Sequence, residues 1–175
     1  MAVAVRQAFN ERGFAGAAQA LGLDPARQAK LMSAHGELVS KIQAAEQAHA
    51  KVTIEGDAVQ IHIAPFPEEG QALRKEWEET LAQILTPEQA ENYNRARGDT
   101  MVFDHAFGDW DQEITLTRDA MGVKMTSKGN RVGPGNATFQ SSSSVSGANA
   151  VDKLPWRHLL PDAAVAKLCG AAAEP

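Results

Sequence analysis

The sequence contains a single cysteine, Cys169, in 175 residues. One cysteine cannot form a disulfide within the chain, so cysteine usage fits an oxidising or a reducing compartment equally well. A catalytic thiolate needs a polarising neighbour, and none is close to Cys169 in the sequence. We therefore expect no catalytic role for this thiol.

Long apolar runs are also missing. No stretch reaches the ~18 consecutive apolar residues of a membrane span, so we expect no membrane insertion of the chain. The first residues, MAVAVRQAFNERG, lack the basic segment and apolar run that are typical of a secretion signal. A processed product with an added methionine fits this start as well.

Positive charge is not in excess: 17 Lys and Arg residues stand against 22 Asp and Glu residues, for a net charge of −5. Nucleic acids and anionic membranes are bound through dense Lys and Arg, and the chain has no basic cluster, so we expect no nucleic-acid partner. Hydrophobic content of 43% with 22% charged residues is typical of a globular protein. A chain of 175 residues normally forms one domain, and we expect a single domain over residues 1–175.

Residues 1–100 are predicted to be mainly helical. Asp24 and Pro25 form a helix start, as N-cap and first helical residue. A further helix opens at APFPEEG, with Glu68 and Glu69 at its positive end, and is expected to bury Leu73, Trp77, Leu81 and Ile84. The helix after Pro25 has one stripe at helical spacing: Leu31, His35, Leu38, Ile42, Ala45 and His49.

A β-hairpin is predicted over residues 51–63, where the hydrophobic period changes to two. The Gly56-Asp57 loop suits a type II′ turn, which requires glycine first. The hairpin would pair Ile54 with Val59 and Val52 with Ile61 on one face. Thr53 would then face Gln60, and Lys51 would face His62, on the other face.

Residues 101–146 are predicted as antiparallel strands, and residues 147–175 as a tail with a short helix that Asp162 would cap. The expected strands are MVFDHAF, QEITLTR, GVKMTSK and NATFQSSSSV. The serine run 141–144 fits a linker or an edge strand. The class is therefore α+β, with two to three helices packed with a hairpin and a C-terminal antiparallel sheet of three to four strands.

A loop over residues 119–122 sets the register of the second and third expected strands. It places Arg118 opposite Val123, and Leu116 opposite Met125, so that apolar residues meet. Glu113 then faces Lys128, which is a typical charge pair of an exposed sheet face.

Two helix starts carry a family resemblance. The segment Leu85-Thr86-Pro87-Glu88-Gln89 resembles the Leu-Thr-x-x-Gln motif of the Spy/CpxP family of periplasmic proteins, with Ile84, Tyr93 and Asn94 as similar flanks. The segment Leu23-Asp24-Pro25-Ala26-Arg27 is similar but has Asp for Thr and Arg for Gln. The resemblance covers the first half of the chain. It implies a non-enzymatic, chaperone-like or stress-related function outside the cytoplasm, whereas a good capping box alone explains the same residues.

The stretch FDHAFGDWDQEI gathers four carboxylates and one histidine. Asp104, His105, Asp109 and Asp111 are the candidate metal ligands, although their spacing misses the helix–loop–helix calcium pattern. Zinc at His105 would need two or three further ligands. The alternative is a solvated sheet face, to which the register already assigns Glu113.

The remaining histidines favour structural roles. His35 and His49 lie ~21 Å apart along one helix, too far to share a metal, and we expect them at the rim of the buried stripe or in a helix contact. His62 is expected to be exposed, and His158 to serve packing or partner contact. No nucleophile elbow or His-Glu-x-x-His pair occurs.

These observations favour a non-enzymatic binding or sensing domain without a cofactor, whose partner is a protein or peptide. The alternative is a small metal-dependent or carboxylate-based hydrolase centred on Asp104, His105, Asp109 and Asp111. A third interpretation is a structural interaction module that oligomerises through the Leu31–His49 stripe, and a homodimer is one such assembly. The resemblance favours the periplasm or envelope over the cytoplasm.

Overall fold

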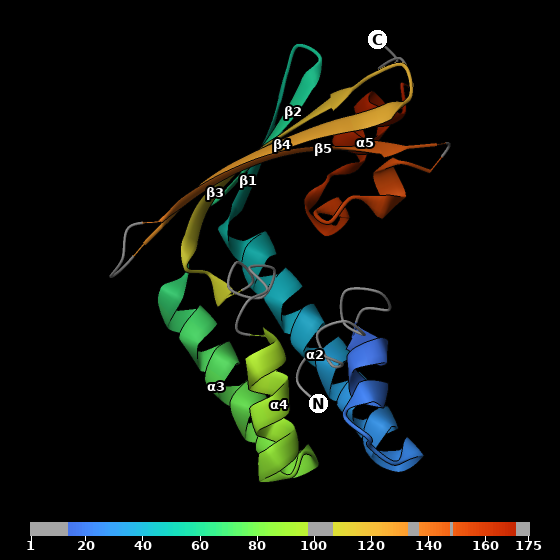
Figure 1. Ribbon diagram of the computed structural model, residues 1–175. Helices are drawn as coiled ribbons and strands as arrows, with labels where there is room; N and C mark the ends of the chain where they lie inside the picture. Colours follow the sequence, from blue (N-terminus) through green and yellow to red (C-terminus); the bar gives the residue numbers. More distant parts are fainter. Residues whose placement is uncertain (1–13, 98–106, 133–136, 148, 171–175) are drawn as a thin grey trace. The chain divides into compact units, whose positions relative to one another are not determined.

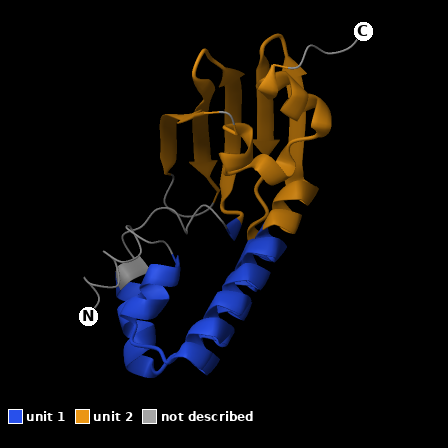
Figure 2. Cartoon of the chain, turned by 90° about the vertical axis from the view of Figure 1, so that its right-hand side faces the viewer, with its two compact units in different colours: residues 1–42, 68–107 blue, residues 43–67, 108–175 orange. Residues whose placement is uncertain are grey.

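The computed structural model describes residues 14–97, 107–132, 137–147 and 149–170. The chain divides into two compact units, residues 1–42 with 68–107 and residues 43–67 with 108–175 (Figure 2). The single-domain expectation stays a prediction, because compact units within one chain need not fold independently.

The first unit is helical. It contains a helix over residues 14–20, most of α2 (Pro25–His49) and α3 (Pro67–Ile84), and α4 (Pro87–Arg97) (Figure 1). The predicted stripe of α3 is confirmed as buried. In the α2 stripe, Leu31 and Leu38 are buried and His35 is half-buried. The largest buried side chains of this unit are Phe14, Leu21, Leu23, Leu31, Leu38, Leu73, Trp77, Leu81, Ile84, Leu85, Tyr93 and Phe107.

Both predicted helix starts are confirmed. The Asp24 carboxylate accepts a hydrogen bond from the backbone N–H of Arg27 at 2.9 Å. At the second start, the N–H of Gln89 donates to Thr86 Oγ1 at 3.3 Å, and the N–H of Thr86 donates to Gln89 Oε1 at 3.0 Å. This is the reciprocal bonding of a capping box.

The two helix starts also bond across the unit. The Arg27 guanidinium donates to the carbonyl of Ile84, just before the second start. The Gln89 side-chain amide donates to the carbonyl of Leu21, just before the first start, at 3.0 Å. Arg27 and Gln89 hold the same position in the two similar segments. Each donates a hydrogen bond to a carbonyl at the end of the helix that precedes the other segment.

The second unit is built on one five-stranded antiparallel sheet with strand order β1-β2-β3-β4-β5. The α+β class is confirmed. The sheet is larger than the predicted C-terminal sheet because the hairpin strand β2 pairs with β3 along the same sheet. Of the expected strand at 101–107, residues 101–106 lie outside the described part of the chain. The strands are β1 (Ala50–Glu55), β2 (Ala58–Ile63), β3 (Trp110–Arg118), β4 (Gly122–Arg131) and β5 (Thr138–Ser146).

Both predicted registers are confirmed. In the hairpin, Ile54 pairs with Val59 and Lys51 with His62. Gly56 has φ +56°, whereas Asp57 does not have a positive φ, since no described non-glycine residue has one. A type II′ turn requires a positive φ at its first central residue only. Between β3 and β4, Glu113 pairs with Lys128 and the whole predicted pairing holds. The serine run lies in β5, so the edge-strand interpretation of that run is correct.

The C-terminal tail covers one face of the sheet (Figure 1). It consists of the 3-10 turns η2 (Val151–Lys153) and η3 (Arg157–Leu159) and the helix α5 (Asp162–Cys169), which contacts β3. Asp162 does not cap α5, because Pro161 holds the N-cap position. The buried side chains of the tail are Ala150, Val151, Leu154, Leu159, Leu160, Ala164 and Leu168, and those of the sheet are Val59, Ile61, Ile63, Trp110, Gln112, Ile114, Leu116, Val123 and Ser127.

Among the described helices, none is long and apolar enough to cross a membrane.

Candidate functional site

The face of the sheet opposite the tail carries polar side chains on all five strands, and we call it the open face. Side chains alternate along each strand, so the apolar set faces the tail and the polar set faces away from it. The registers align these polar residues in rows across the strands. Besides Ala58, the open face consists of Lys51, Thr53, Glu55, Gln60, His62, Asp111, Glu113, Thr115, Thr117, Lys124, Thr126, Lys128, Asn130, Thr138, Gln140, Ser142, Ser144 and Ser146.

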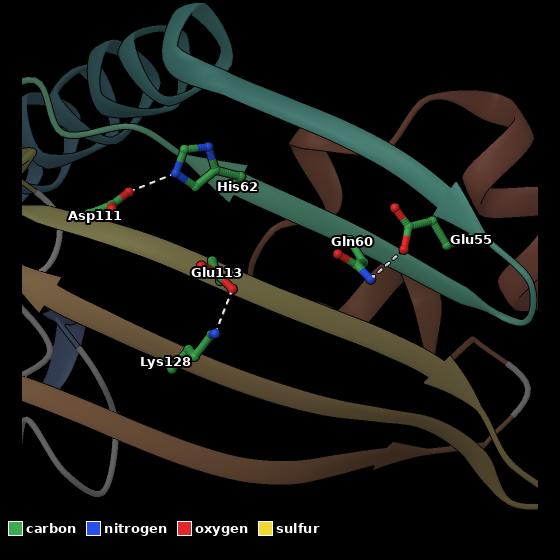
Figure 3. Close-up of polar contacts among 6 residues, drawn as sticks. All are labelled: Glu55, Gln60, His62, Asp111, Glu113 and Lys128. Carbon is green, nitrogen blue, oxygen red and sulfur yellow. Dashed lines mark hydrogen bonds and ion pairs between the residues drawn. The ribbon is translucent and has the colours of Figure 1, made fainter.

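A histidine–carboxylate pair lies on this face. His62 on β2 stands opposite Glu113 on β3, and Asp111 is the next residue of β3 on the same face. The imidazole Nε2 of His62 lies 2.7 Å from Asp111 Oδ1 (Figure 3). Both side chains are nearly half exposed, at 48% and 42%. A carboxylate in this position orients the imidazole ring through the hydrogen bond.

Two further contacts fix the neighbouring side chains. Lys128 Nζ lies 2.7 Å from Glu113 Oε2, and the Gln60 amide donates to Glu55 Oε2 at 3.0 Å (Figure 3). One of these contacts joins opposite charges and the other joins a carboxylate to an amide. The open face offers hydroxyl, amide and paired charged groups for hydrogen bonding.

A shallow hollow of about 460 Å³ lies on the open face over β1, β2 and β3. Its volume is in the range of small-ligand pockets, but such pockets are mostly apolar and enclosed. This hollow is open, and its polar residues carry hydrogen-bonding groups. Such a surface matches a polar chain segment better than a compact apolar ligand. The polar residues that line it are Lys51, Thr53, Glu55, Gln60, His62, Glu113 and Thr115.

The two described candidate metal ligands bond to different partners. Asp111 binds His62, whereas Asp109 lies 3.5 Å from the guanidinium of Arg131, with its side chain 13% exposed. Asp104 and His105 lie outside the described residues. Within the described ranges, no group of three or more His, Cys, Asp or Glu residues is placed to hold a metal ion.

No family model, curated protein or solved structure matches this chain.

A buried histidine–carboxylate pair escaped the sequence-based predictions. His158 in η3 places Nε2 2.7 Å from Oε2 of Glu46 in α2, and both side chains are nearly buried. Burial raises the pKa of Glu46, and the hydrogen bond and charge of His158 partly oppose that rise. Glu46 lies one helical turn after Ile42, beside the stripe of α2, and a carboxylate at that place is the signal in the sequence for a buried partner.

Both histidines of α2 stack on aromatic rings. His35 stacks on Phe14 with ring centroids 3.9 Å apart, and its pKa is lowered by burial. His49 stacks on Phe66 at 5.0 Å. Cys169, the single thiol, is exposed at the end of α5.

Proposed function

We propose that the chain is a non-enzymatic binding domain that holds a polar segment of another protein on the open face of its sheet. The observation that carries the proposal is the hollow over β1–β3, which is lined by charged, hydroxyl and amide side chains. A polypeptide segment supplies matching donors and acceptors, and wet polar interfaces of this kind bind without an apolar pocket.

The geometry of the face supports selective contact over mere solvation. His62 and Asp111 hold each other, as do Glu113 and Lys128. Side chains that are already ordered lose less conformational entropy when a partner binds.

We further propose that the domain acts outside the cytoplasm in a chaperone-like or stress-related function, as its resemblance to the Spy/CpxP family implies. Support comes from the first unit, where Gln89 of the Leu-Thr-x-x-Gln segment bonds both Thr86 and the carbonyl of Leu21. The motif residues thus hold helix ends together. Fractionation of the native cells, with immunodetection of the chain, tests the compartment. Recovery with cytoplasmic markers contradicts it.

The test of binding uses reduced, carboxymethylated α-lactalbumin, a soluble unfolded polypeptide, as the probe. Fluorescence anisotropy of the labelled probe is followed as the full chain is added. We expect saturable binding, and at least a tenfold weaker affinity for Gln60→Arg/Thr115→Arg, which fills the hollow with two bulky cations. The matched control is Thr117→Arg/Thr126→Arg, on the same face but outside the hollow, with an affinity close to that of the unsubstituted chain.

Two results contradict the proposal. Absence of probe binding removes the chaperone-like function. Equal affinity of the two double variants for the probe would show that the binding site lies outside the hollow. Suppression of aggregation of the reduced, unmodified protein at substoichiometric amounts of the chain is the expected functional readout.

The competing function is a small metal-dependent or carboxylate-based hydrolase centred on Asp104, His105, Asp109 and Asp111. The observation that favours it is the His62–Asp111 contact, because a carboxylate-oriented imidazole is a common general base. Metal analysis of the purified chain, with thermal melts with and without EDTA, separates the two functions. Bound metal and a lower melting temperature in EDTA favour the hydrolase.

A further inference from the structure

The strand β5 forms one edge of the sheet. It pairs with β4 over Thr138–Ser146 without a break in register. Within the described ranges, no strand pairs with its outer side. Its side chains are exposed, except for Phe139 and Val145, which are half-buried.

Natural sheets usually protect their edges from pairing with other chains. The usual devices are short strands, charged side chains, prolines and bulges. The opposite edge, β1, has six residues and carries Lys51 and Glu55. In contrast, β5 has nine residues, TFQSSSSVS, with no charge and no proline. The β5 edge therefore lacks the protection that β1 has.

The outward backbone groups of β5 follow from its bonds to β4. The N–H of Arg131 donates to the carbonyl of Ala137, and the N–H of Gly147 donates to the carbonyl of Met121. In an antiparallel pair, such bonds recur at every second residue, so the odd-numbered residues between 137 and 147 bond to β4. The even-numbered residues, with Ser142 at the centre of β5, direct their N–H and C=O groups outward.

The sequence of β5 is nearly symmetric about Ser142. Antiparallel pairing of two copies about that residue sets Ser142 opposite itself and brings outward backbone groups face to face. It also sets Phe139 of each copy opposite Val145 of the other copy. Both of these pairs lie on the face of the sheet that the tail covers. A shift of two residues in either direction loses both apolar contacts, which singles out this register.

We propose that the chain forms a homodimer through β5, in which two copies pair antiparallel about Ser142 and join their sheets into one. Even-numbered residues face even-numbered residues in this register, so both open faces lie on the same side of the joined sheet. The absence of charge on β5 means that the two copies do not repel each other there. This interface is distinct from the hollow over β1–β3 and does not depend on its function.

The interface consists of one strand pair, so we expect reversible, concentration-dependent association and not a permanent dimer. Sedimentation equilibrium of the full chain over a hundredfold range of concentration should show monomer and dimer. Hydrogen exchange should show protection of the Gln140, Ser142 and Ser144 amides that rises with protein concentration.

The decisive variants change Ser142. Ser142→Pro removes an outward N–H without touching a bond to β4, a position where an edge strand tolerates proline, and should abolish the dimer. Ser142→Ala, the matched control, keeps the N–H and should dimerise like the unsubstituted chain. Far-UV circular dichroism and thermal melts verify that both variants fold.

A charge test probes the register and covers the case in which the proline variant fails to fold. Ser142→Lys and Ser142→Glu each place like charges opposite each other, and each alone should associate several-fold more weakly than the unsubstituted chain. An equimolar mixture should form a heterodimer that is tighter than either homodimer. A chain that stays monomeric, variants that dimerise normally, or a mixture without preference for the heterodimer would each overturn the proposal.

Discussion

His158 Nε2 lies 2.7 Å from Oε2 of Glu46, and the two side chains are 14% and 12% exposed. The Gln47 amide also donates to the carbonyl of His158, at 2.8 Å. The C-terminal part of α2 thus holds the η3 turn through a buried ionisable pair and a backbone contact. Both side chains of this pair are less exposed than those of the His62–Asp111 pair on the open face.

Replacement of His158 should destabilise the chain. His158→Ala leaves the Glu46 carboxyl nearly buried without its partner, which costs about 1–3 kcal/mol in the free energy of unfolding. Urea denaturation measures the loss. The control is His62→Ala, which removes an equally short contact to Asp111 that is nearly half exposed. It should cost less than about 1 kcal/mol, and equal losses would contradict the role of burial.

The titration of Glu46 should reflect its burial. Its pKa is raised above the ordinary value of about 4.5 by desolvation, so the folded state binds the proton more tightly than the unfolded state. The stability gained from this difference is present below pH 4.5 and is lost as the pH rises through the folded pKa. Carboxyl-carbon NMR titration should give a raised midpoint, raised further in His158→Ala. A midpoint at or below the ordinary value would contradict a raised pKa for Glu46.

His35 should make the opposite contribution. Burial lowers its pKa from the ordinary 6.5, so the folded state favours the neutral imidazole that stacks on Phe14. Its contribution to stability is present above pH 6.5 and is lost as the pH falls through that value towards the lowered folded pKa. His35→Phe keeps an aromatic ring that does not titrate. On acidification the unsubstituted chain should therefore lose stability relative to this variant. A pH-independent difference would refute this.

The capping box at Thr86 should contribute measurably to stability. Thr86→Ala removes the acceptor for the Gln89 N–H and should lower the free energy of unfolding by about 0.5–2 kcal/mol. Thr80→Ala is the control, since the Thr80 hydroxyl only donates back to the carbonyl of Glu76 within the exposed face of α3. Thermal and urea unfolding of the two variants should separate them. Similar losses of stability in the two variants would show that the Thr86 cap does not stabilise the fold.

The pairing of Glu113 with Lys128 should respond to charge reversal. Glu113→Lys places two lysines opposite each other and should cost about 0.2–1 kcal/mol. The double variant Glu113→Lys/Lys128→Glu should recover most of that loss, more so at low salt because the pair is exposed. A double-mutant cycle from urea denaturation gives the coupling. Additive losses would show that the pair contributes nothing.

Local patterns predicted the local structure well. The pairing of Ile54 with Val59 followed from period-two hydrophobicity around Gly56-Asp57, because a two-residue turn sets the hairpin register. The Thr86–Gln89 cap followed in the same way from side chains three residues apart. The error at Asp162 was also local, since Pro161 takes the cap position there.

The candidate site was predicted only in part. The sequence placed His62 and Asp111 separately on exposed strand faces, but their contact depends on the pairing of β2 with β3. Forty-nine positions separate the two residues, and no turn rule reaches across such a distance. Asp109 likewise finds Arg131 only once β3 and β4 are paired.

The sequence by itself determined the helices, the hairpin, the register of β3 on β4 and the polar character of the open face. These features depend on backbone propensities, caps and turns within a few residues of one another. The tertiary structure alone decided the joining of the hairpin to β3, the burial of Glu46 against His158 and the position of β5 as an unprotected edge. Those features depend on which distant segments bury each other's apolar faces, and many chain arrangements satisfy the same local pattern until the core is packed.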